Sequence, residues 1–348
     1  MTVSDLTEAE LVARIQSRLP PAPDWLIVGI GDDAAVVEPA RGRLEVLTVD
    51  SVVEGVHFDR RFTPPGAIGH RALAVNLSDL AAMGAQPRLA LLSLALPATL
   101  ACGDFDELVG GLTALATRER LTVVGGNLTR SPGPLVVDVT VAGTVKRRQA
   151  LTRGGARPGD GIFVTGTIGA AAAGLQMLRA ARPELQGNGQ RCAADEQDAA
   201  GVQRCIHRYL YAQPRIRIGL LLARNRAATA CMDLSDGLAD GVRRVAEASG
   251  VGILLDADRL PIDPGARRWF DACGADPVVE ALSGGDDYEL VFASRPKLLG
   301  RLRAVTAHGG VPVTRVGVCT PEPGLLVRRG RESAGTTIPL PLGFSHFR

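Results

Sequence analysis

Apolar and β-branched residues gather in short segments along the first part of the chain, and turn signals separate these segments. The pattern predicts strands at 25–30, 44–50, 89–96, 121–125 and 135–145, and helices at 66–84 and 104–119. Thr7 and Glu10 form a capping-box pattern, which predicts one more helix near the start of the chain. Strands mixed with long helices in this way favour an α+β layer over a strict βαβ series.

The segment TRGGARPGD, residues 152–160, interrupts this pattern with glycine and proline and predicts a domain boundary. Beyond it we expect strands at 161–165, 251–256, 288–293 and 312–318, and helices at 169–181, 214–227, 236–249 and 264–273. Residues 183–204 are polar, contain glycine and lack periodicity, which predicts a surface insertion. The sequence therefore predicts two domains, 1–150 and 151–348.

Composition fits a globular protein and excludes several kinds of partner. The chain has 348 residues, a length typical of two domains, with 46% hydrophobic and 22% charged residues. The formal charge is +2, and no run of like charges forms a nucleic-acid-binding arm. The N-terminal segment lacks the apolar core of a signal peptide, and no apolar stretch is long enough to span a membrane. We therefore predict a cytoplasmic protein that binds neither nucleic acid nor membranes.

The segment GIGDDAAVV, residues 29–37, places two carboxylates side by side in a turn framed by glycine. Gly29, Gly31 and Ala34 match the G-x-G-x-x-G/A pattern of dinucleotide-binding folds. In that fold the turn opens a helix that cradles a pyrophosphate, and Asp32 and Asp33 would repel this anion unless a cation lay between them. The following residues are too few and too β-branched for such a helix. The pattern therefore indicates either a solvated turn or a metal site.

Carboxylates recur in turns at the ends of other apolar runs, at Asp33, Asp50, Asp79, Asp233, Asp236, Asp286 and Asp287. Helix capping is the alternative role for Asp79 and Asp236, since each is interpreted as following a serine and preceding a helix, where a negative side chain complements the partial charge of the helix N-terminus. As a set, however, ionised carboxylates beside buried segments are costly unless they are paired or bind a metal, and the chain has only two lysines, Lys146 and Lys297. Oxygen ligands converging from several turns suit magnesium with substrate phosphates.

Other common catalytic patterns are missing from the sequence. It contains no G-x-x-x-x-G-K-[ST] phosphate loop and no protein-kinase set of a strand lysine with an H-R-D loop. Neither a G-x-S-x-G nucleophile motif nor an H-E-x-x-H zinc motif occurs. The sequence therefore favours a magnesium-dependent nucleotide enzyme that lacks a phosphate loop.

Eight motifs along the chain together resemble one family. In order they are GIGDDAAVV, TVDSVVEGVHF, ALAVNLSDLAAMGAQP, VVGGNLTRSPG, ALTRGGARPGD, DLSDGLADG, LSGGDDYELVF and GFSHF. Their order is similar to that of the thiamine-monophosphate kinases, which belong to the aminoimidazole-ribonucleotide synthetase-like (PurM-like) superfamily. The resemblance spans nearly the whole chain except the insertion. It implies a PurM-like two-domain fold with an N-terminal ATP-binding, metal-binding and dimerisation domain.

The resemblance also implies the chemistry. Members of this family transfer the γ-phosphoryl group of ATP to thiamine phosphate with several magnesium ions, which completes the synthesis of thiamine diphosphate. Matching motifs imply metal ligands at Asp33, Thr48, Asp50, Asp79, Asn127, Asp233 and Asp236. They imply ATP contacts at Gly125, Gly126, Asn127, Arg153 and Ser235, and thiamine-phosphate contacts at His57, Asp286 and Phe344. Because the attacking phosphate oxygen is already ionised, we expect no general base, no covalent phospho-enzyme and direct in-line transfer.

Within this resemblance Asp32 is expected to shape its turn, and the two glycines 125 and 126 are expected to form a turn whose N–H groups approach phosphate. Family members pair as homodimers through their N-terminal domains, so a homodimer is expected here too. Two positions depart from the family pattern. Asn127 stands where an aspartate is common, which removes one charge, and Asp286 stands where a glutamate is common.

Two other functions remain open at this stage. The first is another ATP-dependent synthetase of the same superfamily, although the reactive cysteines expected of selenophosphate synthetases and of the hydrogenase maturation proteins are missing from the corresponding ends of the chain. The second is a non-catalytic protein that binds thiamine phosphate or a nucleotide, with Asn127 as the mark of lost chemistry. The metal count, the order of substrate binding and the role of the insertion are not determined by the sequence.

Overall fold

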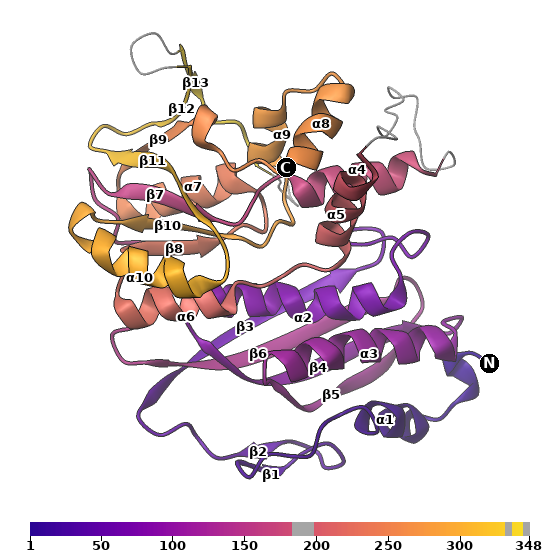
Figure 1. Cartoon of the computed structure of the whole chain (residues 1–348). Coiled ribbons are helices and arrows are strands. Elements are labelled where there is room, and N and C mark those ends of the chain that lie inside the picture. Colours follow the sequence, from indigo (N-terminus) through magenta and orange to yellow (C-terminus); the bar gives the residue numbers. More distant parts are fainter. Residues whose placement is uncertain (183–197, 331–335, 344–348) are drawn as a thin grey trace. The chain divides into compact units, whose positions relative to one another are not determined.

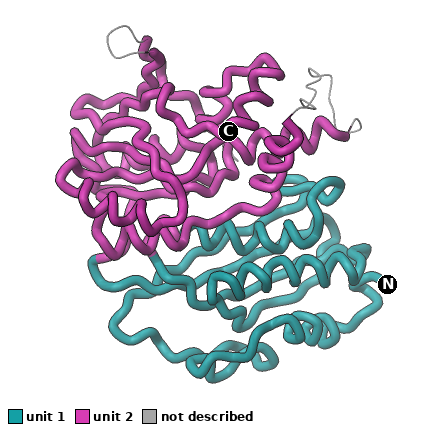
Figure 2. The backbone as a smooth tube through the Cα atoms, viewed as in Figure 1, with its two compact units in different colours: residues 1–80, 85–148 teal, residues 81–84, 149–348 magenta. Residues whose placement is uncertain are grey.

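The computed structural model describes residues 1–182, 198–330 and 336–343. The chain forms two compact units, each described here by itself (Figure 2). Unit 1 consists of residues 1–80 and 85–148, and unit 2 consists of residues 81–84 and 149–348.

The centre of unit 1 is a four-stranded sheet with the strand order β3-β6-β4-β5. Its strands are β3 (Arg43–Val53), β4 (Gln86–Pro97), β5 (Thr122–Ser131) and β6 (Val136–Lys146). β6 pairs antiparallel with both of its neighbours, and β4 and β5 are parallel. The predicted strands at 44–50, 89–96 and 135–145 are confirmed, whereas β5 runs six residues beyond the predicted end at 125.

Helices α2 (Pro65–Ala82) and α3 (Cys102–Arg118) lie against one face of this sheet (Figure 1). Both long helices were predicted from their spacing. They approach each other closely because Gly69 meets the backbone of α3, where an added Cβ would lie 1.8 Å from the Leu108 carbonyl oxygen. Helix α1 (Glu8–Gln16) begins with the predicted capping box, in which Thr7 and Glu10 bond each other's backbone N–H groups.

The opposite face of the sheet is exposed and apolar. Along β3 the side chains alternate between the two faces because successive strand residues point to opposite sides. Leu47 and Val49 are 72% and 58% exposed, and Leu91 of β4 is 41% exposed. An uncovered apolar sheet face of this kind is typical of a surface that binds another protein.

Unit 2 is built on a seven-stranded sheet with the order β13-β12-β9-β11-β7-β10-β8. Among the pairings of the described strands in this sheet, β12 with β9 is parallel and the others are antiparallel. The strands are β7 (Gly161–Thr165), β8 (Ala230–Asp233), β9 (Gly252–Asp256), β10 (Leu290–Ser294), β11 (Val313–Thr320), β12 (Leu325–Arg329) and β13 (Thr336–Pro339). β8 therefore lies at one edge of this sheet.

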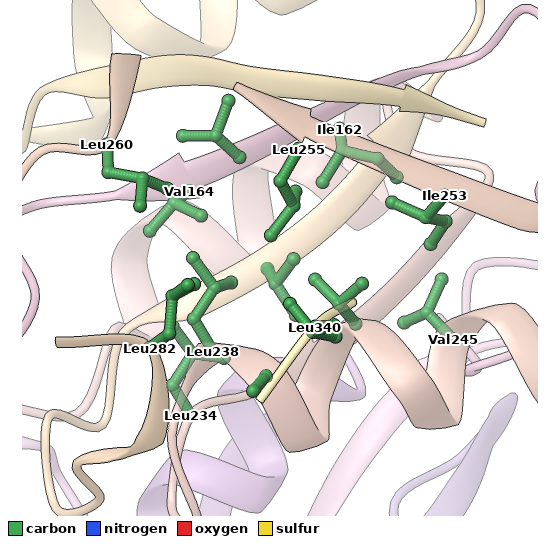
Figure 3. Packing of buried hydrophobic residues seen from close by; sticks show 14 of the residues in the cluster. Ile162, Val164, Leu234, Leu238, Val245, Ile253, Leu255, Leu260, Leu282 and Leu340 are labelled. Carbon is green, nitrogen blue, oxygen red and sulfur yellow. The ribbon is translucent and has the colours of Figure 1, made fainter. Parts of the chain in front are cut away.

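The hydrophobic core of unit 2 lies between the sheet and α7 (Leu238–Ser249) (Figure 3). Ile162 and Val164 of β7 contact this core, and the intervening Phe163 stacks on Phe292 at a centroid distance of 5.5 Å on the other face. The other helices of unit 2 are α4 (Ala170–Ala180), α5 (Ala199–Leu210), α6 (Ile216–Asn225), α8 (Pro264–Ala272), α9 (Pro277–Ser283) and α10 (Leu299–Gly309). Helices α6 and α10 pack together on the face of the sheet opposite α7 (Figure 1).

The structure corrects part of the predicted insertion at 183–204. Residues 199–204 belong to α5, whose Cys205 and Tyr209 are buried, and residues 183–197 lie outside the described part of the chain. Apolar residues of α5 recur at helical spacing, but the polar residues before them hide this signal. β8, α9 and α10 were not predicted either, because short strands and weakly amphipathic helices give little periodicity. None of the helices that the structure describes is long and apolar enough to cross a membrane.

Candidate active site

Unit 1 brings Thr48 and Asp79 into direct contact. Thr48 lies on the face of β3 that α2 covers, and its hydroxyl donates a hydrogen bond to the Asp79 carboxylate of α2. Asp50 lies two residues along the same strand and therefore shares this face. Three predicted metal ligands thus face the same layer of unit 1.

The position of Asp79 excludes the capping alternative for this residue. Asp79 lies in the last turn of α2, which ends at Ala82, and so cannot cap the start of that helix. The C-terminal end of a helix carries partial negative charge, so a carboxylate there is unfavourable unless donors or a cation compensate it. The hydroxyl of Thr48 supplies one such donor.

The turn that contains Asp32 and Asp33 connects β1 (Leu26–Val28) to β2 (Val36–Val37). The Asp32 carboxylate accepts the backbone N–H of Asp33 at 2.9 Å, so Asp32 shapes the turn. Asp33 itself is exposed. Because the residues after the turn form β2 and no helix, the dinucleotide-binding interpretation does not apply here.

Gly125, Gly126 and Asn127 do not form the expected turn, because all three lie within β5. A Cβ on Gly126 would lie 1.8 Å from the Leu92 carbonyl oxygen, so the close approach of β4 and β5 requires glycine there. Asn127 pairs with Ser93, whose neighbours Leu92 and Leu94 point into the core. Asn127 therefore lies on the exposed face of the sheet.

This placement separates Asn127 from the other predicted ligands of unit 1. Cross-strand pairs share a face, and the register links Ser51 to Asp138, Asp138 to Ser93, and Ser93 to Asn127. Ser51 points away from the face that bears Asp50. Within one chain, unit 1 therefore does not bring Asn127 to the Thr48–Asp79 pair.

His57 lies in the turn that follows β3. Its Nδ1 accepts the backbone N–H of Val53 at 3.1 Å, which places the ring proton of the neutral form on Nε2. The same loop borders a hollow of about 460 Å³ whose lining includes Glu54, Asp59 and Arg60. His57 thus belongs to a loop whose charged side chains pair with one another, Arg60 with Glu54 and Arg61 with Asp59.

In unit 2, the predicted site residues meet where β8 ends. Asp233 is the last residue of β8 and is 4% exposed. The Asp286 N–H donates to the Ser235 carbonyl at 2.7 Å, and the Tyr288 N–H donates to the Leu234 carbonyl at 3.0 Å. The structure therefore places the loop that carries Asp286 directly beside Ser235.

Asp236 follows Ser235 in the turn between β8 and α7, and Gly237 caps α7 without a side-chain hydrogen bond. Asp236 is therefore not the capping residue of α7. Within this turn, Asp233 and Asp236 supply two carboxylates close to the loop of Asp286.

The loop of Asp286 has an unusual backbone. Asp286 has a φ of 69° and Tyr288 a φ of 49°, a region that non-glycine residues adopt at an energetic cost. The buried Asp287 between them anchors the loop, since its carboxylate accepts the N–H groups of Gly169 at 2.7 Å and Ala171 at 3.3 Å. Asp287 thus holds the strained loop against the start of α4.

Glu289 forms a second anchor and is fully buried. Its carboxylate accepts hydrogen bonds from the Thr165 hydroxyl at 2.7 Å, from Arg208 Nη2 at 2.8 Å and from Arg215 Nε at 2.6 Å. Arg208 also donates to the Asp287 carbonyl at 3.0 Å. Gly166, with a φ of 60°, leaves room for this carboxylate, because a Cβ there would lie 2.1 Å from Glu289 Oε1.

The four residues of these anchors, Asp287, Glu289, Arg208 and Arg215, were not recognised as part of the site from sequence. The signal in the sequence that could have identified Glu289 is the fully apolar segment that follows it, Leu290–Ala293. Burying an ionised side chain at the start of such a segment is costly in free energy unless it has partners. Nothing in the sequence identified arginines about 75 residues away as those partners.

Burial raises the pKa of Asp287 to about 7 from an ordinary value of 3.8, although the N–H groups of Gly169 and Ala171 and the charge of Arg208 oppose the shift. Between these pH values the folded protein retains a proton that the unfolded chain releases, so stability falls as pH rises from about 4 to about 7. We expect Asp287→Asn to flatten this decline in the melting temperature. The exposed Asp258→Asn change serves as the control, and an unchanged slope in Asp287→Asn would contradict the assignment.

Two predicted contacts lie at the borders of this region of unit 2. Thr152, next to Arg153, accepts the Cys231 N–H of β8 through its carbonyl at 2.8 Å, so Arg153 lies beside the edge strand. Phe344 lies outside the described residues. Its neighbour Gly343 packs on the Asp236 turn, where an added Cβ would lie 2.8 Å from the Asp236 carbonyl oxygen.

The donors in both units fit magnesium in kind. Among the residues that the structure describes, no three His, Cys, Asp or Glu side chains form a complete metal cluster. Instead, oxygen donors occur as Thr48 with Asp79 in unit 1 and as Asp233 with Asp236 in unit 2. Magnesium commonly takes one or two carboxylates and completes its shell with water and substrate phosphates, and the hard oxygen donors here match that preference.

Family models and related proteins identify the family of the chain. Residues 31–145 match the N-terminal domain of AIR synthase related proteins, and residues 157–329 match their C-terminal domain. The thiamine-monophosphate kinase of Bacillus subtilis (strain 168) is 36% identical over 297 residues, which cover 83% of this chain and 84% of that protein.

Two solved structures support the same assignment. The thiamine-monophosphate kinase from Stenotrophomonas maltophilia K279a has a TM-score of 0.78 and 38% identity, with 92% of this chain and 96% of that chain covered. The structure described as AaThiL complexed with AMPPCP and TMP has a TM-score of 0.73 and 30% identity, with 100% and 99% covered. The fold is thus the PurM-like two-domain fold, and the chain belongs to the thiamine-monophosphate kinase family of AIR synthase related proteins.

Proposed function

We propose that the protein phosphorylates thiamine monophosphate with ATP, giving thiamine diphosphate and ADP. The observation that carries this proposal is the match over the full chain to AaThiL, whose structure contains AMPPCP and TMP. The acidic residues of each unit add chemical support, because their carboxylates are oxygen donors of the kind that bind magnesium together with substrate phosphates.

The reaction transfers one phosphoryl group between two oxygens. The bond from the γ-phosphorus to the β-phosphate oxygen of ATP breaks, and a bond forms from the γ-phosphorus to a phosphate oxygen of thiamine monophosphate. Because the attacking oxygen is already ionised, no side chain needs to remove a proton, and catalysis consists of positioning and charge neutralisation. Consistent with this chemistry, the proposed metal ligands of unit 2 are carboxylates, and no histidine is among the proposed site residues of that unit.

The protein's residues would divide this work between the two units. Asp33, Thr48, Asp50 and Asp79 would hold magnesium in unit 1, and Asp233 and Asp236 would hold it in unit 2. When bound, magnesium supplies positive charge to the transferred phosphoryl group. Gly125, Gly126, Arg153 and Ser235 would orient ATP, whereas His57, Asp286 and Phe344 would orient thiamine phosphate.

A cytoplasmic homodimer is part of the same proposal. The exposed sheet face of unit 1, with Leu47, Val49 and Leu91, is the surface that a second copy would cover. This face also bears Asn127, which lies opposite the Thr48–Asp79 pair. Pairing through this face would therefore place Asn127 at the dimer interface.

The direct test measures the release of ADP in assays that contain ATP and magnesium. Thiamine phosphate, thiamine and aminoimidazole precursors are supplied in separate assays as the phosphoryl acceptor. We expect turnover only with thiamine phosphate, together with formation of thiamine diphosphate. Turnover with another acceptor would assign the chain a different reaction within the superfamily. Binding of ATP and thiamine phosphate without ADP release would instead identify a protein that keeps the pocket and lacks the chemistry.

A further inference from the structure

An open cavity of about 640 Å³ lies at one end of β8 and β10 in unit 2, and no predicted site residue lines it. Its volume is in the range of small-molecule sites, roughly 300–1,000 Å³. Four arginines line the cavity, and no carboxylate residue does: Arg157, Arg226, Arg295 and Arg301. We propose that this arginine cavity is a second anion-binding site that takes a small molecule with a phosphate or diphosphate group.

The charge around the cavity is not compensated by the described residues. None of the four arginines that line the cavity forms an ion pair with a carboxylate of the described residues. Arg208 and Arg215, by contrast, both pair with Glu289. Asp160, which does not line the cavity, is 3% exposed and accepts the Thr229 hydroxyl at 2.8 Å and the Arg157 N–H at 3.1 Å. The cavity lining thus carries four arginines and no carboxylate, so the cavity attracts anions.

Arg295 has an unsatisfied donor at this site. Its Nε is buried and has no hydrogen-bond partner among the described residues. Among the described residues, the side chain of Arg301 donates a single hydrogen bond, from Nη1 to the Asn225 carbonyl at 3.4 Å, which is at the long limit of a hydrogen bond. The planar forks of these arginines therefore retain donors of the kind that bind phosphate oxygens in pairs.

The arginine cavity is separate from the predicted active-site residues of unit 2. Thr229 in its wall directly precedes β8, and Arg295 directly follows β10. The two strands are antiparallel, and Asp233 pairs with Leu290 at their opposite end. Four strand residues span roughly 10–13 Å, so the cavity lies at the far end of β8 from Asp233. Only the Gly155–Arg157 segment brings it near a predicted ATP contact, Arg153.

Inorganic pyrophosphate in the presence of EDTA is a selective probe for this site. Without a divalent cation the carboxylates of the proposed active site repel a polyanion, whereas the arginines of the cavity attract it. We expect calorimetric titration of the full-length protein to show binding that weakens as salt is raised. The proposal does not depend on which acceptor the enzyme phosphorylates.

The decisive comparison is between two double variants. Arg295→Gln with Arg301→Gln is expected to weaken pyrophosphate binding at least tenfold and to leave the KM for ATP unchanged. The control, Arg224→Gln with Arg303→Gln, removes two exposed arginines from α6 and α10 that do not line the cavity, and it is expected to bind as the wild type does.

Three results would overturn the proposal. The first is that the wild type does not bind pyrophosphate in EDTA. The second is that both double variants lose pyrophosphate binding equally, because this would indicate general attraction to the basic surface. A rise in the KM for ATP that parallels the loss of pyrophosphate binding would show that the arginines belong to the ATP site.

Discussion

Asp79→Asn is expected to lower kcat for ADP release by about 100-fold or more, and raising the magnesium concentration is expected to restore part of the loss. The change removes a negative charge at the point where Thr48 and Asp79 meet, and electrostatic groups at a transferring phosphoryl centre are each worth about two to three orders of magnitude. The measurement is a magnesium titration of the initial rate with ATP and thiamine phosphate saturating.

The exposed Asp24→Asn change removes the same charge from unit 1 outside the proposed site and serves as the matched control. Its rate and magnesium dependence are expected to equal those of the wild type. Both variants are expected to keep the wild-type melting temperature, because Asp79 retains an oxygen acceptor for Thr48 as asparagine. If Asp79→Asn keeps full activity at limiting magnesium, Asp79 is not a metal ligand.

Glu289→Gln is expected to destabilise unit 2 by about 3–5 kcal/mol, since removing one partner of a buried ion pair leaves the remaining charges uncompensated. Glu289 is fully buried, and the side chains of Arg208 and Arg215 are 13% and 15% exposed. The side-chain NH₂ group of a glutamine would face the guanidinium donors of Arg208 and Arg215. Donors facing donors form no hydrogen bond, because this position needs a hydrogen-bond acceptor. The measurement is the melting temperature, together with hydrogen exchange of β10 and the loop of Asp286.

The control for this change is Glu322→Gln on an exposed turn of unit 2, which is expected to shift stability by no more than about 0.5 kcal/mol. We also expect Glu289→Gln to raise the KM for thiamine phosphate more than the KM for ATP, because the loop that it anchors carries Asp286. Wild-type stability of Glu289→Gln would mean that the two arginines find other partners.

Local sequence patterns predicted many of the elements that position the site. The capping box at Thr7 and the long helices with regular apolar spacing depend on residues within a few positions of one another, so they are visible in the sequence. Elements that are too short or too weakly periodic to give such a local pattern were not predicted. β8 has only four residues, and α5 begins within a polar stretch whose helical spacing is incomplete.

The glycine motif at 125–126 shows why a motif alone gives an incorrect local structure. Two adjacent glycines are typical of a turn, but here they lie within a strand, where the Leu92 backbone comes too close to Gly126 for a side chain. The cause is a contact with a strand about 30 residues away, which no local pattern records.

By itself, the sequence determined the family, the PurM-like two-domain fold and the chemical type of the donors, because each depends on residue identities in a fixed order along the chain. The tertiary structure decided which residues meet. It paired Thr48 with Asp79, placed Asn127 on the opposite face of the sheet, and joined Glu289 to Arg208 and Arg215. These contacts arise from strand register and from the burial of charge, which requires partners wherever the fold can supply them.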